Sequence, residues 1–155
     1  MKGHCVPTSL IEMTEGGFAV SCIFCDIIEK KAHAFILYEN ETVCCFLDKI
    51  PINKGHVLVV PKKHYPEFSE VDEESLKQVI LTAQKAARSL ETLLHTDGIT
   101  IMQNNGVFKD VEHYHMHIIP RFKDDGFSWN EPEITVDEDD FAEMKARLQT
   151  CFGEK

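Results

Sequence analysis

The stretch His113-Tyr114-His115-Met116-His117-Ile118-Ile119 alternates histidine with apolar side chains. This alternation predicts a β-strand, because successive side chains of a strand point to opposite faces of the sheet. The three histidines would share one face, with successive ones about 7 Å apart. Histidine titrates near neutral pH and binds metals, so a face built from it indicates a metal site, a catalytic site or both. The simpler alternative is a surface strand with incidental histidines.

Length and charge limit the range of functions. The 155 residues fit one domain with a sizeable core. The chain carries 16 Lys and Arg against 26 Asp and Glu, a formal net charge of -10. This balance predicts no nucleic-acid partner, because sequence-independent affinity for nucleic acids comes from cations that neutralise phosphates. A local cluster such as Lys62 and Lys63 still allows a small anionic substrate.

No segment of the sequence is expected to enter a membrane. The N-terminal region lacks an apolar stretch of signal-peptide length, and no apolar run is long enough to span a bilayer. We therefore expect a soluble, cytoplasmic protein. A chain of this size in a reducing compartment needs no disulfide framework, so its cysteines are expected to be free thiols or metal ligands. The cysteines are Cys5, Cys22, Cys25, Cys44, Cys45 and Cys151.

The chain is predicted to consist of an N-terminal arm and one domain. Residues 1–21 show no sustained periodicity, although Leu10, Ile11 and Phe18 could add a short edge strand. No repeat and no long linker divides the remainder, so residues 22–155 are predicted to form a single domain.

Apolar periodicity predicts five strands and three helices. The strands are expected at 35–39, 42–48, 56–60, 99–103 and 113–119, the first two joined as a hairpin. A short helix begins at Cys22, a long helix runs from Asp72 to a stop at Gly98, and a third helix begins at Asp137. The third helix is expected to carry an apolar face made of Phe141, Met144, Leu148 and Phe152.

Cys22 and Cys25 form a Cys-x-x-Cys pair, which alone is a weak signal. Redox pairs of this kind usually follow a strand in a βαβ unit, which is not predicted here. The pair could instead be half of a zinc site, which needs two more nitrogen or sulfur ligands. His64 and one histidine of the 113–119 stretch can supply them.

The three histidines are not expected to share one metal ion. The outer two lie too far apart on a strand to reach an ion about 2 Å from each ligand, which favours dividing them between structural and chemical roles. A neutral imidazole is a competent nucleophile and leaving group, suited to two-step transfer through a covalent histidine adduct. Phosphorus chemistry is favoured over peptide hydrolysis, because no serine or cysteine nucleophile with a triad is visible. His56 could be a satisfied core histidine.

These motifs resemble a known family. Residues 113–119 match the His-φ-His-φ-His-φ-φ signature of the histidine triad (HIT) superfamily of nucleotide hydrolases and transferases. Three further motifs resemble zinc-containing bacterial HIT proteins of the branch that acts on nucleoside phosphoramidates: Cys22-Ile-Phe-Cys-Asp-Ile-Ile, Phe46-Leu-Asp, and Lys54-Gly-His-Val-Leu-Val-Val-Pro-Lys-Lys-His. The resemblance covers about residues 22–127. It implies an α+β HIT fold, an antiparallel sheet of about five strands with a long, a short and a C-terminal helix, and a homodimer.

The resemblance also implies an activity and its residues. His115 is similar to the nucleophile that attacks the α-phosphorus, forming a nucleotidyl-histidine that water hydrolyses to a nucleoside monophosphate. His117 and His56 resemble its supporting histidines. The implied contacts to a purine nucleotide are Asp48 for the ribose, Ile23, Phe24 and Ile27 for the base, and Asn104 beside the phosphate. The implied structural zinc ligands are Cys22, Cys25, His64 and His113. Alternatives are a dinucleoside polyphosphate hydrolase and a non-catalytic nucleotide-binding regulatory module.

One segment departs from the family pattern. Family members commonly carry Gly-Gln-Ser-x-aromatic before the first triad histidine, where this chain has Phe108-Lys-Asp-Val-Glu and is about two residues shorter. The absence of the serine and glutamine leaves the leaving-group preference, and the phosphoramidase activity itself, open. Lys109 could place a charge near the phosphate, or be an ordinary solvated loop lysine.

Overall fold

The computed structural model describes residues 22–153, and the expected N-terminal arm lies outside them. The sheet and the first two helices belong to one compact unit that ends at Phe127. Helix α3 (Glu138–Gly153) belongs to a second unit and is considered by itself. The extent of the predicted single domain stays a prediction.

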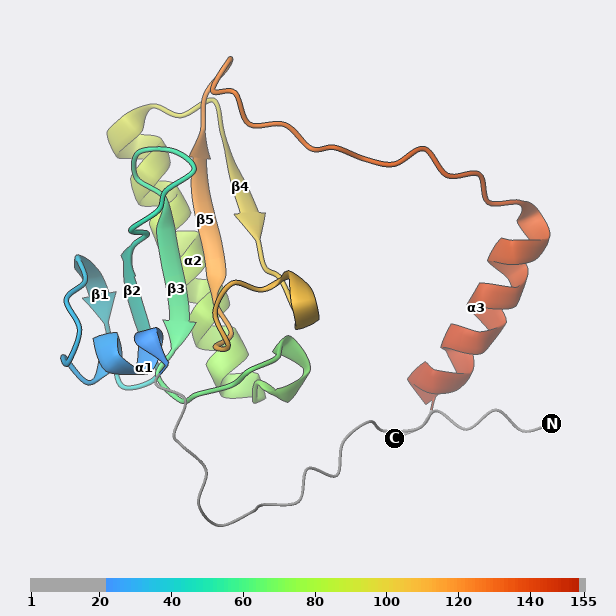
Figure 1. Ribbon diagram of the computed structural model, residues 1–155, viewed down its shortest axis with the longest axis horizontal. Coiled ribbons are helices and arrows are strands. Elements are labelled where there is room, and N and C mark those ends of the chain that lie inside the picture. The colour runs from blue at the N-terminus through green and yellow to red at the C-terminus, as the bar shows by residue number, and fades with distance from the viewer. Residues whose placement is uncertain (1–21, 154–155) are drawn as a thin grey trace, which may run out of the picture. The chain divides into compact units, whose positions relative to one another are not determined.

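Five antiparallel strands form the sheet, which confirms the expected α+β fold class (Figure 1). Their order across the sheet is β1-β2-β3-β5-β4. The strands are β1 (Ile36–Glu39), β2 (Val43–Leu47), β3 (Val57–Pro61), β4 (Gly98–Met102) and β5 (Met116–Arg121). The hairpin of β1 and β2 is as predicted.

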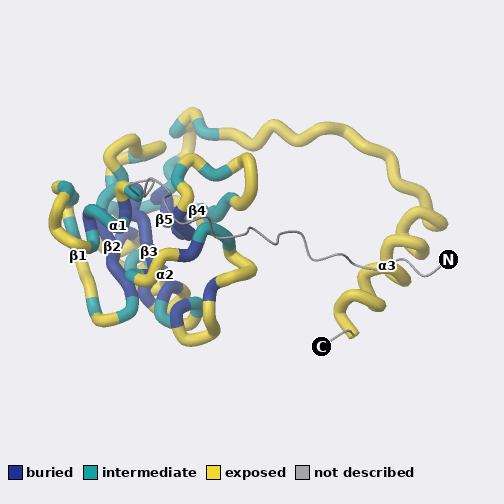
Figure 2. The backbone as a smooth tube through the Cα atoms, turned by 60° about the horizontal axis from the view of Figure 1, so that its bottom comes forward, coloured by how far each residue is buried: buried dark blue, intermediate teal, exposed yellow. Residues whose placement is uncertain are grey.

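The central strands are buried on both faces, as their continuous apolar sequences require (Figure 2). Alternate side chains of β3 enter two separate hydrophobic clusters. Val57 and Val59 pack with helix α2 (Glu73–Leu94) on one face. Leu58 and Val60 pack with helix α1 (Ile23–Ile28) on the opposite face. The sheet is therefore a layer between a long and a short helix.

The histidines keep the predicted alternation, although the regular strand starts later than expected. Tyr114, Met116 and Ile118 all enter the cluster on the α2 side, which leaves the histidines for the α1 side. Only His117 lies within β5, because β3 pairs with residues 116–118 alone. Before that point the backbone bonds differently: the Tyr114 N–H donates to the Tyr65 carbonyl at 2.6 Å. The prediction of one strand over 113–119 is corrected accordingly.

Helix α2 begins as predicted but ends earlier. The Asp72 side chain accepts a hydrogen bond from the Ser75 N–H at 2.9 Å, which caps the first turn. His95 then adopts the left-handed conformation, with φ 51° and ψ 50°, and ends the helix. Gly98 is therefore not the stop that was expected, since it is the first residue of β4.

Helix α3 confirms the expected C-terminal helix. Asp137 precedes its first residue, and the Asp137 carboxylate accepts a hydrogen bond from the Asp140 N–H at 2.9 Å. Within residues 22–153, no helix is long and apolar enough to cross a membrane.

Candidate active site and metal centre

The histidines of residues 113–117 divide between two neighbouring clusters on the α1 side of the sheet. His113, His115 and His117 are all buried. His113 faces His64, with ring centroids 4.9 Å apart, whereas His115 faces His117 at 4.8 Å. The first cluster also contains two cysteines, and the second contains His56.

The structure brings together the two cysteines and two histidines of the first cluster. Cys22 precedes α1 and Cys25 lies in its first turn, while His64 follows β3. The Cys22 sulfur lies 3.4 Å from His113 Nδ1, and the Cys25 sulfur lies 3.3 Å from His64 Nδ1 and 3.6 Å from His113 Nδ1. In a tetrahedral zinc site, bond lengths of about 2.3 Å to sulfur and 2.0–2.1 Å to nitrogen separate these atoms by about 3.6 Å. These three sulfur–nitrogen distances therefore fit a tetrahedral ion, and all four ligand atoms lie within 4.8 Å of one another.

The protonation of His113 suits a metal ligand. Its Nε2 lies 2.8 Å from the Pro61 carbonyl oxygen, which can only accept, so Nε2 carries a proton and Nδ1 has its lone pair toward the sulfurs. Burial lowers the pKa of His113 to about 4, which favours this neutral form. Burial and the neighbouring Cys22 raise the pKa of the Cys25 thiol to about 11, and a bound cation would reverse that effect by stabilising the thiolate.

His115 presents one nitrogen to the second cluster. Its Nδ1 lies 2.6 Å from the carbonyl oxygen of His113, so Nδ1 donates a hydrogen bond to the backbone. The ring also packs against Phe24 in a T-shaped contact, with ring centroids 5.1 Å apart. With its orientation fixed in this way, His115 has Nε2 as the nitrogen that is not bonded to the backbone.

A chain of hydrogen bonds sets the protonation of His117. The Ile52 N–H donates to His56 Nδ1 at 3.2 Å, so the proton of neutral His56 lies on Nε2. His56 Nε2 is 3.0 Å from His117 Nδ1 and donates to it, which leaves the proton of His117 on its own Nε2. Burial lowers the pKa of both histidines, that of His117 to about 4, and keeps them neutral.

Asp48 lies beside this chain. Its Oδ1 accepts a hydrogen bond from the Ile50 N–H at 2.8 Å, and its Oδ2 is 3.3 Å from His56 Nδ1. The second contact is an ion pair only if His56 is charged, which its burial opposes. Asp48 therefore stabilises the turn before β3 through its Oδ1. Its Oδ2 has no strong hydrogen bond and could contact a ligand.

The residues expected to contact a nucleotide differ in accessibility. Phe24 and Ile27 are buried in the cluster between α1 and the sheet, whereas Ile23 is 48% exposed. Ile23 is therefore the member of this set that a base could contact most directly. Asn104 follows β4 and is partly buried.

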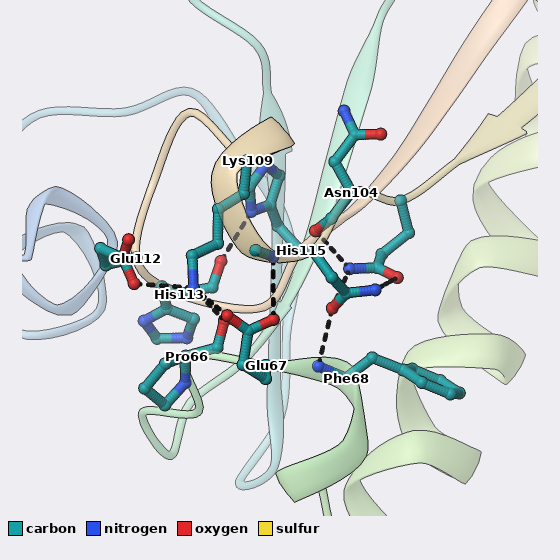
Figure 3. Close-up of polar contacts among 11 residues, drawn as sticks. Pro66, Glu67, Phe68, Asn104, Lys109, Glu112, His113 and His115 are labelled. Carbon is teal, nitrogen blue, oxygen red and sulfur yellow. Dashed lines mark hydrogen bonds and ion pairs between the residues drawn. The ribbon is translucent and has the colours of Figure 1, made fainter. Parts of the chain in front are cut away.

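The loop that departs from the family pattern is pinned by Lys109 (Figure 3). The Lys109 ammonium pairs with the carboxylates of Glu67 and Glu112, and it donates to the Pro66 carbonyl oxygen at 3.3 Å. The Lys109 side chain is only 6% exposed. The expectation of an ordinary solvated loop lysine is therefore wrong, and the ammonium is already paired with two carboxylates.

Asp110 is a site residue to which the sequence patterns assigned no role. Its Oδ1 lies 3.1 Å from His115 Nε2. Its position in the segment that replaces the family's serine-containing run was the available signal. Only the folded loop shows that its carboxylate reaches Nε2 of the central histidine.

Comparison with known proteins gives one family. The HIT domain model matches residues 29–124. An uncharacterized HIT-like protein of Mycoplasma pneumoniae is 42% identical over 113 residues, covering 71% of this chain and 78% of the relative. The chain is also 32% identical over 124 residues to an adenosine 5′-monophosphoramidase of Schizosaccharomyces pombe, covering 77% of this chain and 90% of that enzyme.

Solved structures give the same result. A HIT family protein from Bacillus subtilis superposes with a TM-score of 0.78 at 34% identity, covering 83% of this chain and 95% of that one. A zinc-bound histidine triad protein from Mycobacterium smegmatis superposes with a TM-score of 0.66 at 31% identity, covering 87% and 98%.

Proposed function

Because the chain belongs to the HIT domain family, we propose that it is a nucleotide hydrolase that acts through a nucleotidyl-histidine on His115. The observation that carries this proposal is the pair of hydrogen bonds at the Nδ1 atoms of two histidines. His115 is held by the backbone at Nδ1, which leaves Nε2 as the nucleophile. His117 is held by His56 at Nδ1, which leaves its Nε2–H as a donor. A nucleophile and a hydrogen-bond donor thus lie side by side.

The proposed reaction has two steps. His115 Nε2 attacks the α-phosphorus and the bond to the leaving group breaks, giving the nucleotidyl-histidine. Water then attacks the same phosphorus, the nitrogen–phosphorus bond breaks, and a nucleoside monophosphate is released. The His117 Nε2–H can stabilise the charge that develops on the phosphoryl oxygens in both steps. His56 acts through His117, because it fixes where the His117 proton lies.

The proposed substrate is a nucleoside phosphoramidate or a related nucleotidyl conjugate of a purine nucleoside. The activity named for the Schizosaccharomyces pombe relative supports this class. Asp48 would meet the ribose, Ile23 with Phe24 and Ile27 the base, and Asn104 the phosphate. A dinucleoside polyphosphate is the alternative substrate. We expect the protein to act as a cytoplasmic homodimer.

The proposed metal is a structural zinc ion, held by Cys22, Cys25, His64 and His113. The tetrahedral spacing of the four ligand atoms and the zinc-bound Mycobacterium smegmatis relative support it. Zinc would link the start of α1 to the segment that precedes β5. Because His113 lies two residues before His115, this link would hold the nucleophile in position.

The proposal is tested with adenosine 5′-phosphoramidate and the His115→Ala variant. The wild-type protein should release AMP, measured by chromatography, and should form an acid-labile adenylylated protein that a rapid quench traps. His115→Ala should do neither, while His33→Ala, which replaces a histidine outside both clusters, should behave as wild type. AMP release by His115→Ala at the wild-type rate would contradict the role of His115.

A non-catalytic nucleotide-binding module is the second candidate. The observation that favours it is the contact between Asp110 and His115 Nε2, which occupies the atom needed for attack. In that case calorimetry would detect AMP binding, and no phosphoramidate or dinucleoside polyphosphate would release AMP even at high protein concentration.

A further inference from the structure

We propose that Asp110 is the general acid and general base of the reaction and carries one proton between His115, the leaving group and water. This inference rests on the proposed function and deepens it. Asp110 Oδ1 lies 3.1 Å from His115 Nε2, the atom that would attack phosphorus. Within residues 22–153, it is the carboxylate that contacts this nitrogen.

The two atoms lie at hydrogen-bond distance. His115 Nδ1 donates to the carbonyl oxygen of His113 at 2.6 Å, so Nε2 is the nitrogen that faces Asp110. The separation of 3.1 Å between Asp110 Oδ1 and His115 Nε2 allows a proton to be shared by these two atoms and to pass from one to the other.

The loop places Asp110 while leaving its side chain room to turn. Lys109, the preceding residue, is anchored by Glu67 and Glu112 (Figure 3). The Gly106 N–H donates to Glu67 Oε2 at 3.1 Å, which ties the start of the loop to the same carboxylate. The Asp110 side chain itself is 75% exposed. Rotation of that side chain can therefore move the carboxyl group off Nε2, where phosphorus must enter, toward the leaving group.

The neighbouring titratable groups do not suit this task. Burial lowers the pKa of His117 to about 4, so the ring is neutral, and loss of its remaining proton would give an imidazolate. His56 already uses its proton in the bond to His117. The Lys109 ammonium is held by two carboxylates, one of which is that of Glu112. Asp110 is the carboxyl group that contacts Nε2, and its side chain is exposed and free to turn.

In the first step the shared proton passes to Asp110, and the lone pair of His115 Nε2 forms the bond to phosphorus. The bond from phosphorus to the leaving nitrogen breaks, and that nitrogen takes the proton from Asp110 and departs as an amine. Asp110 is then a carboxylate beside the nucleotidyl-histidine. General acid catalysis of this kind contributes about 10²–10⁴-fold to a rate.

In the second step the Asp110 carboxylate removes a proton from water as the water oxygen bonds to phosphorus. The nitrogen–phosphorus bond breaks and its electron pair returns to His115 Nε2. The nucleoside monophosphate leaves, and the proton is again shared by Asp110 and His115. One water is consumed, and one amine and one monophosphate are released.

The test uses two adenosine substrates with leaving groups of different quality. The propylamine of adenosine 5′-(N-propyl)phosphoramidate needs a proton to depart, whereas the nitrophenolate of adenosine 5′-(4-nitrophenyl)phosphate does not. Asp110→Asn should lower kcat/KM for the propyl substrate by about 100-fold. With the nitrophenyl substrate it should release a burst of about one nitrophenolate per site, followed by slow turnover and accumulation of the adenylylated protein, because the base for water is missing.

Two variants of the loop serve as controls. Glu112→Gln disturbs the anchoring of Lys109 but does not change the Asp110 carboxyl group. Any loss of activity should therefore be equal for both substrates, and no burst of nitrophenolate should appear. Asp110→Glu keeps a carboxyl group and should retain part of the activity toward the propyl substrate.

The possible results are distinguishable. Equal loss on both substrates in Asp110→Asn, or wild-type rates on both, would overturn the role of Asp110 while leaving the proposed function intact. A wild-type protein that cleaves only the nitrophenyl substrate would also overturn it, because no acid would then assist the leaving group. If the wild-type protein cleaves neither substrate faster than His115→Ala, the proposed function itself fails.

Discussion

His56 Nε2 donates a hydrogen bond to His117 Nδ1 across 3.0 Å, although 61 residues separate the two in the chain. The pairing of β3 with β5 brings them together, since Leu58 lies opposite His117 in that ladder. The bond determines which nitrogen of His117 carries its proton. It therefore connects the packing of the sheet directly with the donor that we propose for the phosphate.

Replacing His56 should weaken catalysis without abolishing nucleotide binding. In His56→Ala the proton of His117 is free to occupy either nitrogen, so the donor at Nε2 is lost part of the time. We expect kcat for adenosine 5′-phosphoramidate to fall about 10- to 100-fold, less than the full loss of an oxyanion donor. His56→Gln, whose amide can still donate, should retain more activity than His56→Ala. A His56→Ala variant with wild-type kcat would contradict the assigned hydrogen-bond chain.

Removal of a metal ligand should destabilise the folded protein and also slow the reaction that it catalyses. Elemental analysis should find about one zinc per chain in the wild type and far less in Cys25→Ser. The variant should melt at a lower temperature, because the binding energy of a structural metal is part of the folding energy. Cys151→Ser, outside the cluster, serves as the control. Equal zinc content in wild type and Cys25→Ser would refute the four-ligand site.

Acidification should reduce stability through His117. The pKa of His117 is about 4 in the folded protein, against about 6.5 in the unfolded chain. Between these values the unfolded state binds a proton that the folded state does not, so the free energy of unfolding falls as pH falls. Between pH 7 and pH 4, the free energy of unfolding measured with denaturant should fall by up to about 3 kcal/mol more in wild type than in His117→Asn. Parallel pH curves for the two proteins would contradict this effect.

Replacing Lys109 should loosen the loop that carries Asp110. Lys109→Met removes the ammonium group that pairs with the carboxylates of Glu67 and Glu112. We expect severalfold lower kcat on every substrate and lower protection of residues 105–112 in hydrogen exchange. Lys62→Met, which removes a lysine paired with Glu39 on the sheet, is the matched control. Unchanged exchange of this loop in Lys109→Met would show that the lysine is not its anchor.

The periodicity of apolar residues was sufficient to predict most of the helices and strands, because each has a strong local pattern. The stripe of α2, the hairpin and the alternation of residues 113–119 all correspond to observed elements or faces. The element ends were less predictable: His95 ends α2 because of its own backbone conformation, which no apolar pattern encodes. The strand at 113–119 is shortened because β3 supplies a partner for only part of it.

The sequence by itself determined the residue types at the site and predicted that the histidines divide between two roles. Cys-x-x-Cys and three alternating histidines are local patterns, which can be recognised without knowledge of the fold. Only the tertiary structure decided the environment of each group. Lys109 proved to be buried against Glu67, and Asp110 proved to contact His115 Nε2. Such contacts depend on how a loop packs onto distant residues, and a change of a few ångströms decides whether a charge is solvated, paired or positioned on a nucleophile.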